Sequence, residues 1–303
     1  MGELKRRRDG LLAAAAAYGL WGFLPVYFVA LQPSGAVEIV GWRIALSLIF
    51  CVVILLVMRR VRRTFGLLAG PAMLGWSALA SLLILVNWGV YVYASLNAFI
   101  VEAALGYFIN PLVTVGLGVI VLKETLRPLQ WVALGLAVVA VVVLAIGYGA
   151  FPFIALTLAF SFGFYGFVKN RMGPGVKAID SLTLETLWLT PLAIGLLVWV
   201  ALGSGLTLGT LGPWHTLLLL SAGAVTSIPL LFFGAAVRRL PLSVLGLMQY
   251  LAPVMQFVFG ALVMGEAMPV ERWVGFGIVW FALILLSVDA LGQRRNRFHF
   301  PPS

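Results

Sequence analysis

Apolar residues in this chain occur in runs of about 20, separated by short polar segments. A helix rises 1.5 Å per residue, so roughly 20 apolar residues cross a hydrocarbon core of about 30 Å. Each run therefore predicts one membrane-spanning helix. The runs cover residues 10–31, 36–58, 72–97, 101–122, 128–147, 150–168, 180–202, 213–235, 242–264 and 269–291. We expect an all-α membrane protein with ten transmembrane helices and no separate soluble domain.

The basic residues are unevenly distributed between the connections. Of the 20 Lys and Arg residues, 18 lie at the two termini or in every second connection, while Arg272 lies in another connection and Arg43 inside a run. Positively charged loops stay on the cytoplasmic side of a membrane. We therefore expect both termini in the cytoplasm and an even number of spans. The net charge of +10 then marks topology rather than a nucleic-acid partner.

The composition argues against several other classes of protein. Hydrophobic residues make up 62% of the chain and charged residues only 10%, against roughly 25% charged in a soluble domain. The single cysteine, Cys51, lies in an apolar run and cannot form an intramolecular disulfide. The sequence contains neither a metal-ligand cluster nor a nucleotide-binding loop. We therefore expect no metal, no cofactor and no ATP-driven transport. No catalytic constellation, such as paired acids or a His with a nucleophile, stands out in the sequence either, so we expect no enzyme activity.

An internal repeat relates the two parts of the chain. Pro111, Glu124, Trp131 and Gly135 recur, each 142 residues later, as Pro253, Glu266, Trp273 and Gly277. A half with five spans ends on the side opposite to its start, so the second copy must be inverted. We expect a first repeat at 8–148, an inverted second repeat at 149–292 and a basic cytoplasmic tail at 293–303. Inverted repeats are typical of secondary transporters, whose substrate site lies near the bilayer midplane.

Several short strings of the sequence form a further pattern, and the most specific is the string from Glu102 to Leu112. The other positions are Glu38, Trp42-Arg43, Asn87 to Tyr91, Tyr165-Gly166, Lys169, Glu185-Thr186, Thr226, Pro229-Leu230, Arg239-Leu240, Ser243, Gly246, Gln249-Tyr250 and Pro253. In these positions the chain resembles, nearly end to end, the RarD-type members of the EamA family in the drug/metabolite transporter (DMT) superfamily. It differs at Trp42 and Ala104, where the family often has His and Ser.

The resemblance implies a ten-helix inner-membrane permease with the EamA fold, grouped with chloramphenicol-sensitivity proteins and with relatives that export amino acids or drugs. We expect a secondary-active or facilitative transporter that exports small amphiphilic metabolites by alternating access. A membrane-embedded sensor or lipid-modifying enzyme scaffold without transport is the alternative. Substrate and lipid bilayer are then the partners, and the acidic residues described below are candidates for proton coupling.

Arg43 is the clearest ionisable residue inside an apolar run. It lies about 7 residues into the second run, which at 1.5 Å per residue is a depth of roughly 10 Å below the outer surface of the membrane. A charge at a helix centre costs about 2.5–3.5 kcal/mol on insertion scales, so its presence needs a reason. Arg43 has two possible roles. It is either a functional cation, which anchors a substrate carboxylate or pairs with an acidic residue in a gate, or one partner of a structural ion pair between helices.

Three acidic residues are candidates for gating or coupling. Glu38 and Glu102 begin the second and fourth runs, where a carboxylate can cap a helix N-terminus as well as act in a gate. Glu185 lies about five residues into the seventh run, and the basic connection before that run contains its expected partner, Lys169.

Two amides and two prolines lie deep in the predicted spans. Asn87 and Asn110 can bind substrate or join helices through their amide groups. Pro111 follows Asn110 directly and frees the carbonyl four residues back from its helical hydrogen bond. We expect a helix break at Pro111 and a second one at Pro253, because interrupted helices in both halves indicate a binding site.

Aromatic residues flank these polar groups and can line a cavity for small amphiphiles. The alternative is that they face lipid, as many membrane aromatics do. The predicted substrate-binding residues are Arg43, Asn87, Trp88, Tyr91, Tyr107, Asn110, Gln249, Tyr250, Trp21 and Tyr165. The predicted gating or coupling residues are Glu38, Glu102, Glu185 and Lys169.

Overall fold

The computed structural model describes residues 2–122, 128–148, 151–173, 175–237, 239–240 and 248–297, and these residues form helices and connections without a strand. The helices of the first part are α1 (Gly2–Gly22), α2 (Leu24–Ala30), α3 (Ala36–Val57), α4 (Val61–Gly66), the 3-10 turn η1 (Leu67–Ala69), α5 (Pro71–Leu96), α6 (Ile100–Leu122) and α7 (Pro128–Tyr148). Those of the second part are α8 (Phe153–Arg171), α9 (Ala178–Leu202), α10 (Pro213–Leu220), α11 (Ala222–Val237), α13 (Leu251–Val258), the π-helical segment η2 (Phe259–Val263) and α14 (Val270–Arg297).

The observed helices follow the predicted runs. Seven helical stretches are long and apolar enough to cross a membrane: 4–30, 36–57, 71–96, 100–117, 178–202, 213–236 and 270–288. Three shorter apolar helices cover 128–144, 153–169 and 251–263. The protein is therefore a multi-pass helical membrane protein, whereas ten complete crossings stay a prediction. α14 continues into the predicted tail as far as Arg297, and residues 242–247 lie outside the described residues.

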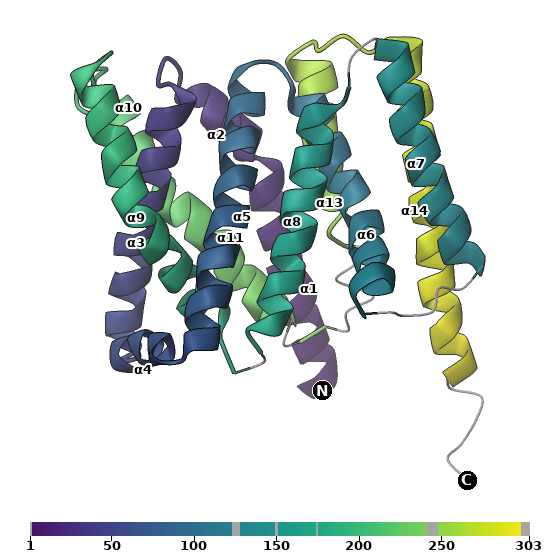
Figure 1. Ribbon diagram of the computed structural model, residues 1–303, viewed down its shortest axis with the longest axis horizontal. Helices are drawn as coiled ribbons and strands as arrows, with labels where there is room; N and C mark the ends of the chain where they lie inside the picture. Colours follow the sequence, from purple (N-terminus) through teal and green to yellow (C-terminus); the bar gives the residue numbers. More distant parts are fainter. Residues whose placement is uncertain are drawn as a thin grey trace.

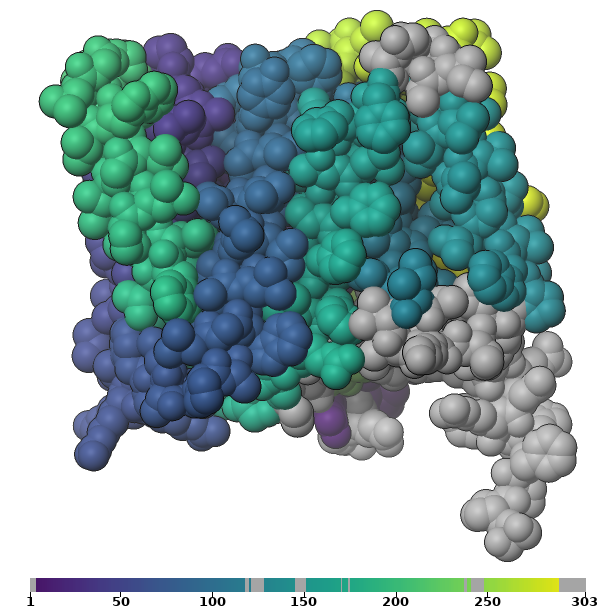
Figure 2. Space-filling model, viewed as in Figure 1, coloured from purple at the N-terminus to yellow at the C-terminus, as the bar shows by residue number. Residues whose placement is uncertain are grey.

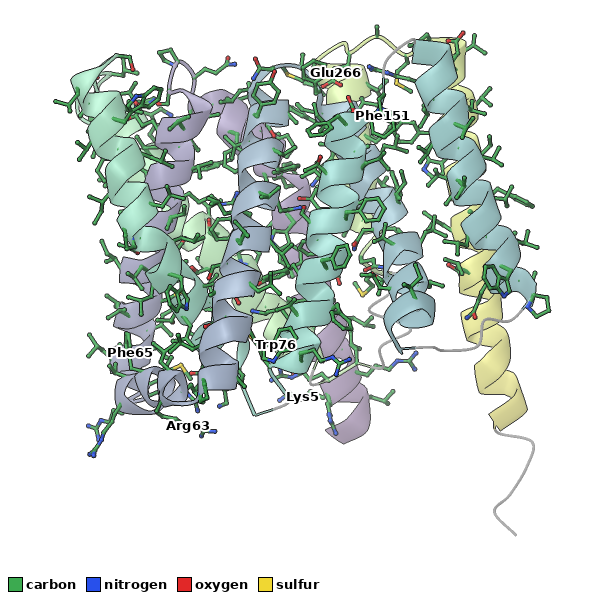
Figure 3. All side chains as sticks on the ribbon, in the orientation of Figure 1. Lys5, Arg63, Phe65, Trp76, Phe151 and Glu266 are labelled. Atoms are coloured by element: carbon green, nitrogen blue, oxygen red, sulfur yellow. The ribbon has the colours of Figure 1, made fainter. Side chains whose placement is uncertain are left out.

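The helices stand side by side as a slab, and α1 begins at the same end of the slab at which α14 finishes (Figure 1). Lys5 and Arg63 lie at this end, while Phe151 and Glu266 lie at the opposite end (Figure 3). We call these the basic end and the acidic end. α7 and α14 pack against each other at one edge of the slab.

Contacts between the two predicted halves run along helix pairs, notably α6 with α8, α3 with α9 and α3 with α11. Two glycines allow backbones to touch there. A Cβ on Gly106 of α6 would lie 2.6 Å from the carbonyl oxygen of Ala155 on α8, and one on Gly223 of α11 would lie 2.3 Å from that of Leu46 on α3. Only a residue without a side chain fits at such distances. Small residues serve the same purpose in other membrane helix interfaces.

The interior and the surface are both largely apolar, as expected for a protein in lipid. On the face shown in Figure 2, the side chains of α9, α5 and α8 form a continuous wall. Large apolar residues such as Leu202 and Trp199 are mostly exposed on α9, where lipid would cover them. Cys51 is buried, with its Sγ 3.6 Å from the Oγ of Ser227 on α11.

Candidate functional site

The guanidinium of Arg43, on α3, lies inside the helix bundle, and only 5% of the residue is exposed. Its Nε donates a hydrogen bond to Thr226 Oγ1 on α11 at 2.9 Å. Its Cζ lies 4.3 Å from the ring centroid of Trp88 and 5.4 Å from that of Phe28. Among the described residues, no carboxylate forms an ion pair with Arg43. The structural ion pair, one of the two sequence alternatives, is therefore not observed in the described part of the chain.

Aromatic rings from α2 and α5 face this guanidinium, and a ring from α6 packs against them. Tyr91 lies three residues after Trp88 on α5, so the two side chains share one face of the helix. The ring of Tyr91 meets Phe28 at a centroid distance of 6.0 Å and Tyr107 at 5.5 Å, both edge-to-face. We define the Arg43 cluster by its members Phe28, Arg43, Trp88, Tyr91, Tyr107 and Thr226.

Asn87 connects the Arg43 cluster to α8. Tyr107 Oη donates a hydrogen bond to Asn87 Oδ1 at 3.0 Å. Asn87 Nδ2 donates to Ser161 Oγ at 3.1 Å and to the carbonyl oxygen of Leu158 at 3.3 Å. The amide thus links α5, α6 and α8, which is the interhelical alternative considered for it.

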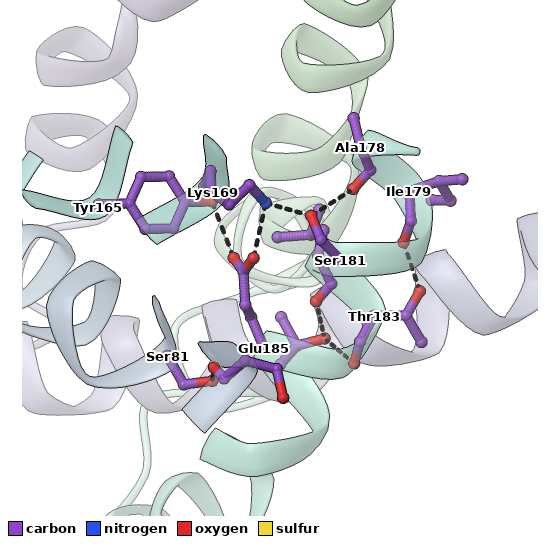
Figure 4. A network of polar contacts seen from close by, with 11 residues as sticks. Ser81, Tyr165, Lys169, Ala178, Ile179, Ser181, Thr183 and Glu185 are labelled. Atoms are coloured by element: carbon purple, nitrogen blue, oxygen red, sulfur yellow. Dashed lines mark hydrogen bonds and ion pairs between the residues drawn. The ribbon is translucent and has the colours of Figure 1, made fainter. Parts of the chain in front are cut away.

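A second polar cluster lies on α8 and α9 (Figure 4). The side chain of Glu185 is fully buried; its Oε1 accepts a hydrogen bond from Lys169 Nζ at 2.6 Å and its Oε2 accepts one from Tyr165 Oη at 2.8 Å. Lys169 also donates to Ser181 Oγ, and its Nζ lies 5.1 Å from the Tyr165 ring centroid. The predicted pairing of Glu185 with Lys169 is confirmed as a contact. Tyr165 belongs to this cluster rather than to the Arg43 cluster.

Glu102 is a helix cap, but not of the helix that carries it. It lies in the first turn of α6, and its Oε1 accepts hydrogen bonds from the backbone N–H groups of Ile154 at 3.1 Å and Ala155 at 3.4 Å. These amides begin α8, where the helix leaves N–H groups without an intrahelical partner. The carboxylate therefore joins the two predicted halves at the acidic end.

Glu266 makes the reciprocal contact, which the sequence did not predict. It accepts hydrogen bonds from the N–H groups of Ile100 at 2.6 Å and Val101 at 2.9 Å, and so caps α6 from the loop before α14. Burial raises the pKa of this carboxyl, while the two amide donors oppose that shift. The internal repeat could have singled out Glu266, because this residue matches Glu124 at the 142-residue offset. Glu124 itself lies outside the described residues.

Glu38 takes part in a third contact between the predicted halves. Its Oε1 accepts hydrogen bonds from the N–H of Thr207 at 2.8 Å and, within α3, from the indole of Trp42 at 3.3 Å. The hydroxyl of Thr207 contacts Ser34 Oγ at 2.6 Å, and Ser34 Oγ in turn contacts His215 Nε2 at 3.0 Å. Glu38 is only 2% exposed. Its hydrogen bond to Thr207 holds the α9–α10 loop against α3.

Asp180 is a further acidic residue that sequence reasoning missed. It lies in the first turn of α9, where its Oδ2 accepts a hydrogen bond from the N–H of Lys177 at 3.2 Å. Arg60 Nη2 forms an ion pair with the same oxygen at 2.7 Å, and Thr64 Oγ1 donates to Oδ1 at 2.7 Å. Asp180 thereby joins α9 to the basic segment around α4.

The two predicted helix breaks differ from each other. α6 is continuous through Pro111, so the proline is tolerated inside the helix rather than ending it. The Oδ1 of Asn110 is buried and has no described hydrogen-bond donor. Pro253 lies in the first turn of α13, where a missing N–H costs nothing because that turn has no intrahelical acceptor for it.

Three predicted substrate-binding residues lie in other packing groups. Trp21 packs against Phe233 at a centroid distance of 5.7 Å, beside α11 and α13. Tyr250 stacks on Phe108 at 6.4 Å, next to α14. Gln249 precedes Tyr250 and is half-buried. The ring contacts described for Trp21 and Tyr250 are therefore with these groups, although Trp21 also packs against the core that contains Phe28, Trp88 and Tyr91.

Long apolar helices with short connections, together with polar clusters buried between them, define a multi-pass membrane protein with a polar interior. The family model described as the EamA-like transporter family matches the chain twice, over residues 9–146 and 151–288. The chain belongs to the EamA family of transporters.

Relatives at high identity support this assignment over nearly the full length. Protein RarD of Streptomyces exfoliatus is 50% identical, with 96% of this chain and 91% of that protein covered. Protein RarD of Escherichia coli is 39% identical, with 97% and 99% covered. The chloramphenicol-sensitive protein RarD of Pseudomonas aeruginosa is 31% identical, with 95% and 97% covered. One crystal structure shares the fold at 17% identity, with a TM-score of 0.61 over 92% of this chain and 97% of that one.

Proposed function

We propose that this transporter is a permease of the bacterial inner membrane that exports small amphiphilic metabolites, such as amino acids or drugs, by alternating access. The observation that carries the proposal is the Arg43 cluster. A buried cation without a carboxylate partner among the described residues lies against aromatic rings of α2 and α5, and Thr226 on α11 accepts a hydrogen bond from it. The cluster therefore draws on both predicted halves, as a site between halves must.

The proposed topology has ten crossings in two inverted halves, 8–148 and 149–292, with both termini in the cytoplasm. The two successive family matches support the division. The common end of α1 and α14, together with Lys5 and Arg63 at that end, supports placing the basic end in the cytoplasm.

In this mechanism the polar contacts at the two ends act as gates. Glu38, Glu102 and Glu266 hold segments of opposite halves together at the acidic end. Arg60 and Asp180 do so nearer the basic end. The Lys169–Glu185 pair is the candidate for coupling to protons, because ionisable residues paired inside membrane helices often form proton relays.

Transport by the purified protein in liposomes tests the proposal. We expect saturable flux of labelled phenylalanine, or of another small amphiphile from a panel of amino acids and drugs including chloramphenicol, down its gradient. An imposed pH gradient would accelerate this flux if protons are coupled. The absence of both flux and saturable binding across the panel would contradict the proposal.

A further inference from the structure

Three cations between the helices differ in their partners. Lys169 and Arg60 each contact a buried carboxylate, Glu185 at 2.6 Å and Asp180 at 2.7 Å. Arg43 is more deeply buried than either of their side chains, yet its described contacts are one hydroxyl and two aromatic rings. A desolvated charge without a counterion costs several kcal/mol. The missing counterion is the feature that needs an explanation.

The carboxylate on the same helix is already engaged. Glu38 precedes Arg43 by five residues, but its Oε1 accepts from the amide of Thr207 and the indole of Trp42. Nearby phenols do not replace a carboxylate, because a neutral phenol does not neutralise a cation, and the hydroxyls of Tyr27 and Tyr107 donate to the carbonyl oxygen of Leu218 and to Asn87 Oδ1. The described residues therefore leave the positive charge of Arg43 uncompensated.

Two polar atoms in the Arg43 cluster also lack hydrogen-bond partners. Arg43 Nη1 and Tyr91 Oη are both buried, and neither has a partner among the described residues. Both residues adjoin the same ring, because the Phe28 ring centroid lies 5.4 Å from the guanidinium carbon of Arg43 and 6.0 Å from the ring centroid of Tyr91. Buried donors without acceptors are rare, and each costs about 1–3 kcal/mol.

We infer that the Arg43 cluster binds the carboxylate of a monoanionic ligand that has a flat apolar body. The carboxylate accepts from Arg43 Nη1 and Tyr91 Oη, and the apolar body lies against the rings of Phe28 and Trp88. One unpaired cation balances one negative charge, so a phosphate dianion would remain uncompensated in this interior. The inference rests on the proposed function and narrows its substrate class.

The test compares two ligands of nearly the same shape, the anion 3-phenylpropionate and its neutral amide 3-phenylpropionamide, in which an NH2 group replaces one carboxylate oxygen. Binding to the purified full-length protein is measured by calorimetry and by thermal stabilisation. Because hydrogen bonds to charged groups contribute about 1.5–3 kcal/mol, we expect the carboxylate to bind roughly tenfold to a hundredfold more tightly than the amide.

Three variants assign this preference to the site. Arg43→Gln should abolish it, and Tyr91→Phe, which keeps the ring, should weaken carboxylate binding about three- to tenfold with little effect on the amide. Arg62→Gln removes an exposed cation near the basic end and should leave both affinities unchanged. Tyr91→Phe still gives a readout if Arg43→Gln does not fold.

Two results would overturn the inference. The first is equal affinity for the acid and the amide, and the second is binding of neither ligand by the folded protein. In both cases flux of other substrates in liposomes would leave the proposed transport function standing. Loss of that flux together with all ligand binding would instead contradict the proposed function itself.

Discussion

At the scale of single residues, the best defined polar contact is that of Glu185 with Lys169 and Tyr165. The carboxylate of Glu185 is fully buried, so water cannot replace a partner that is lost. Lys169 keeps 27% of its side chain exposed and can reach water. Removing one partner should therefore affect the two residues unequally.

We expect Lys169→Met to destabilise the protein more than Glu185→Gln, since the first leaves a buried carboxylate without its cation. Losses of about 3–5 kcal/mol for Lys169→Met and about 1–3 kcal/mol for Glu185→Gln are expected from buried ion pairs and charged hydrogen bonds. Thermal unfolding in detergent measures both, and the double variant gives the coupling energy. Equal effects, or a coupling energy near zero, would show that the contact contributes little.

At the scale of helices, Glu102 and Glu266 form a reciprocal pair of caps, each serving a helix of the other predicted half. We expect Glu102→Ala to accelerate amide hydrogen exchange at Ile154 and Ala155, and Glu266→Ala to do so at Ile100 and Val101. Loss of a cap costs about 0.5–2 kcal/mol. Where local opening of the helix limits amide exchange, this cost raises the exchange rate about threefold to thirtyfold.

Mass spectrometry of deuterated peptides reads out both sites in one experiment. Glu271→Ala, in the first turn of α14, is the matched control and should change neither site. Faster exchange spread over the whole chain would mean that these carboxylates stabilise the fold globally rather than cap single helices.

Close packing between helices gives a second comparison at this scale. Gly106→Ala would place a methyl group 2.6 Å from the carbonyl oxygen of Ala155, so α6 and α8 must separate, at a cost of about 1–3 kcal/mol. Gly166→Ala meets nothing within 4 Å and should be neutral or stabilise α8 by up to about 1 kcal/mol. Chemical denaturation of the two variants would show the difference, and equal stability would contradict the contact.

The helices could be predicted because an apolar run of membrane length has few alternatives to a helix. The neighbours of each helix could not, because nearly every apolar face can pack against any other. Arg43 was recognisable as a buried cation, but its contact with Thr226 depends on α3 crossing α11. Glu185 and Lys169 were predictable as partners because only a short connection separates their helices.

At the scale of the whole molecule, alternating access requires the acidic end to open. Ser34 Oγ and Thr207 Oγ1 lie 2.6 Å apart on segments of opposite predicted halves. Cysteines at these positions should bring their Cβ atoms near the roughly 3.5–4.5 Å that a disulfide needs. We expect the oxidised Ser34→Cys, Thr207→Cys double variant to lose flux in liposomes and to regain it on reduction. Undiminished flux in the fully cross-linked protein would mean that this end stays closed throughout transport.

The burial of Cys51 has a practical consequence for such work. Its thiol lies beside Ser227 inside the bundle, where water-soluble maleimides and spin labels do not reach it. Reporter cysteines can therefore be introduced into the native chain for site-directed labelling without first replacing Cys51. Reporter pairs can be placed on the two ends of the slab without altering residue 51, and distances between them can be followed as ligand is added.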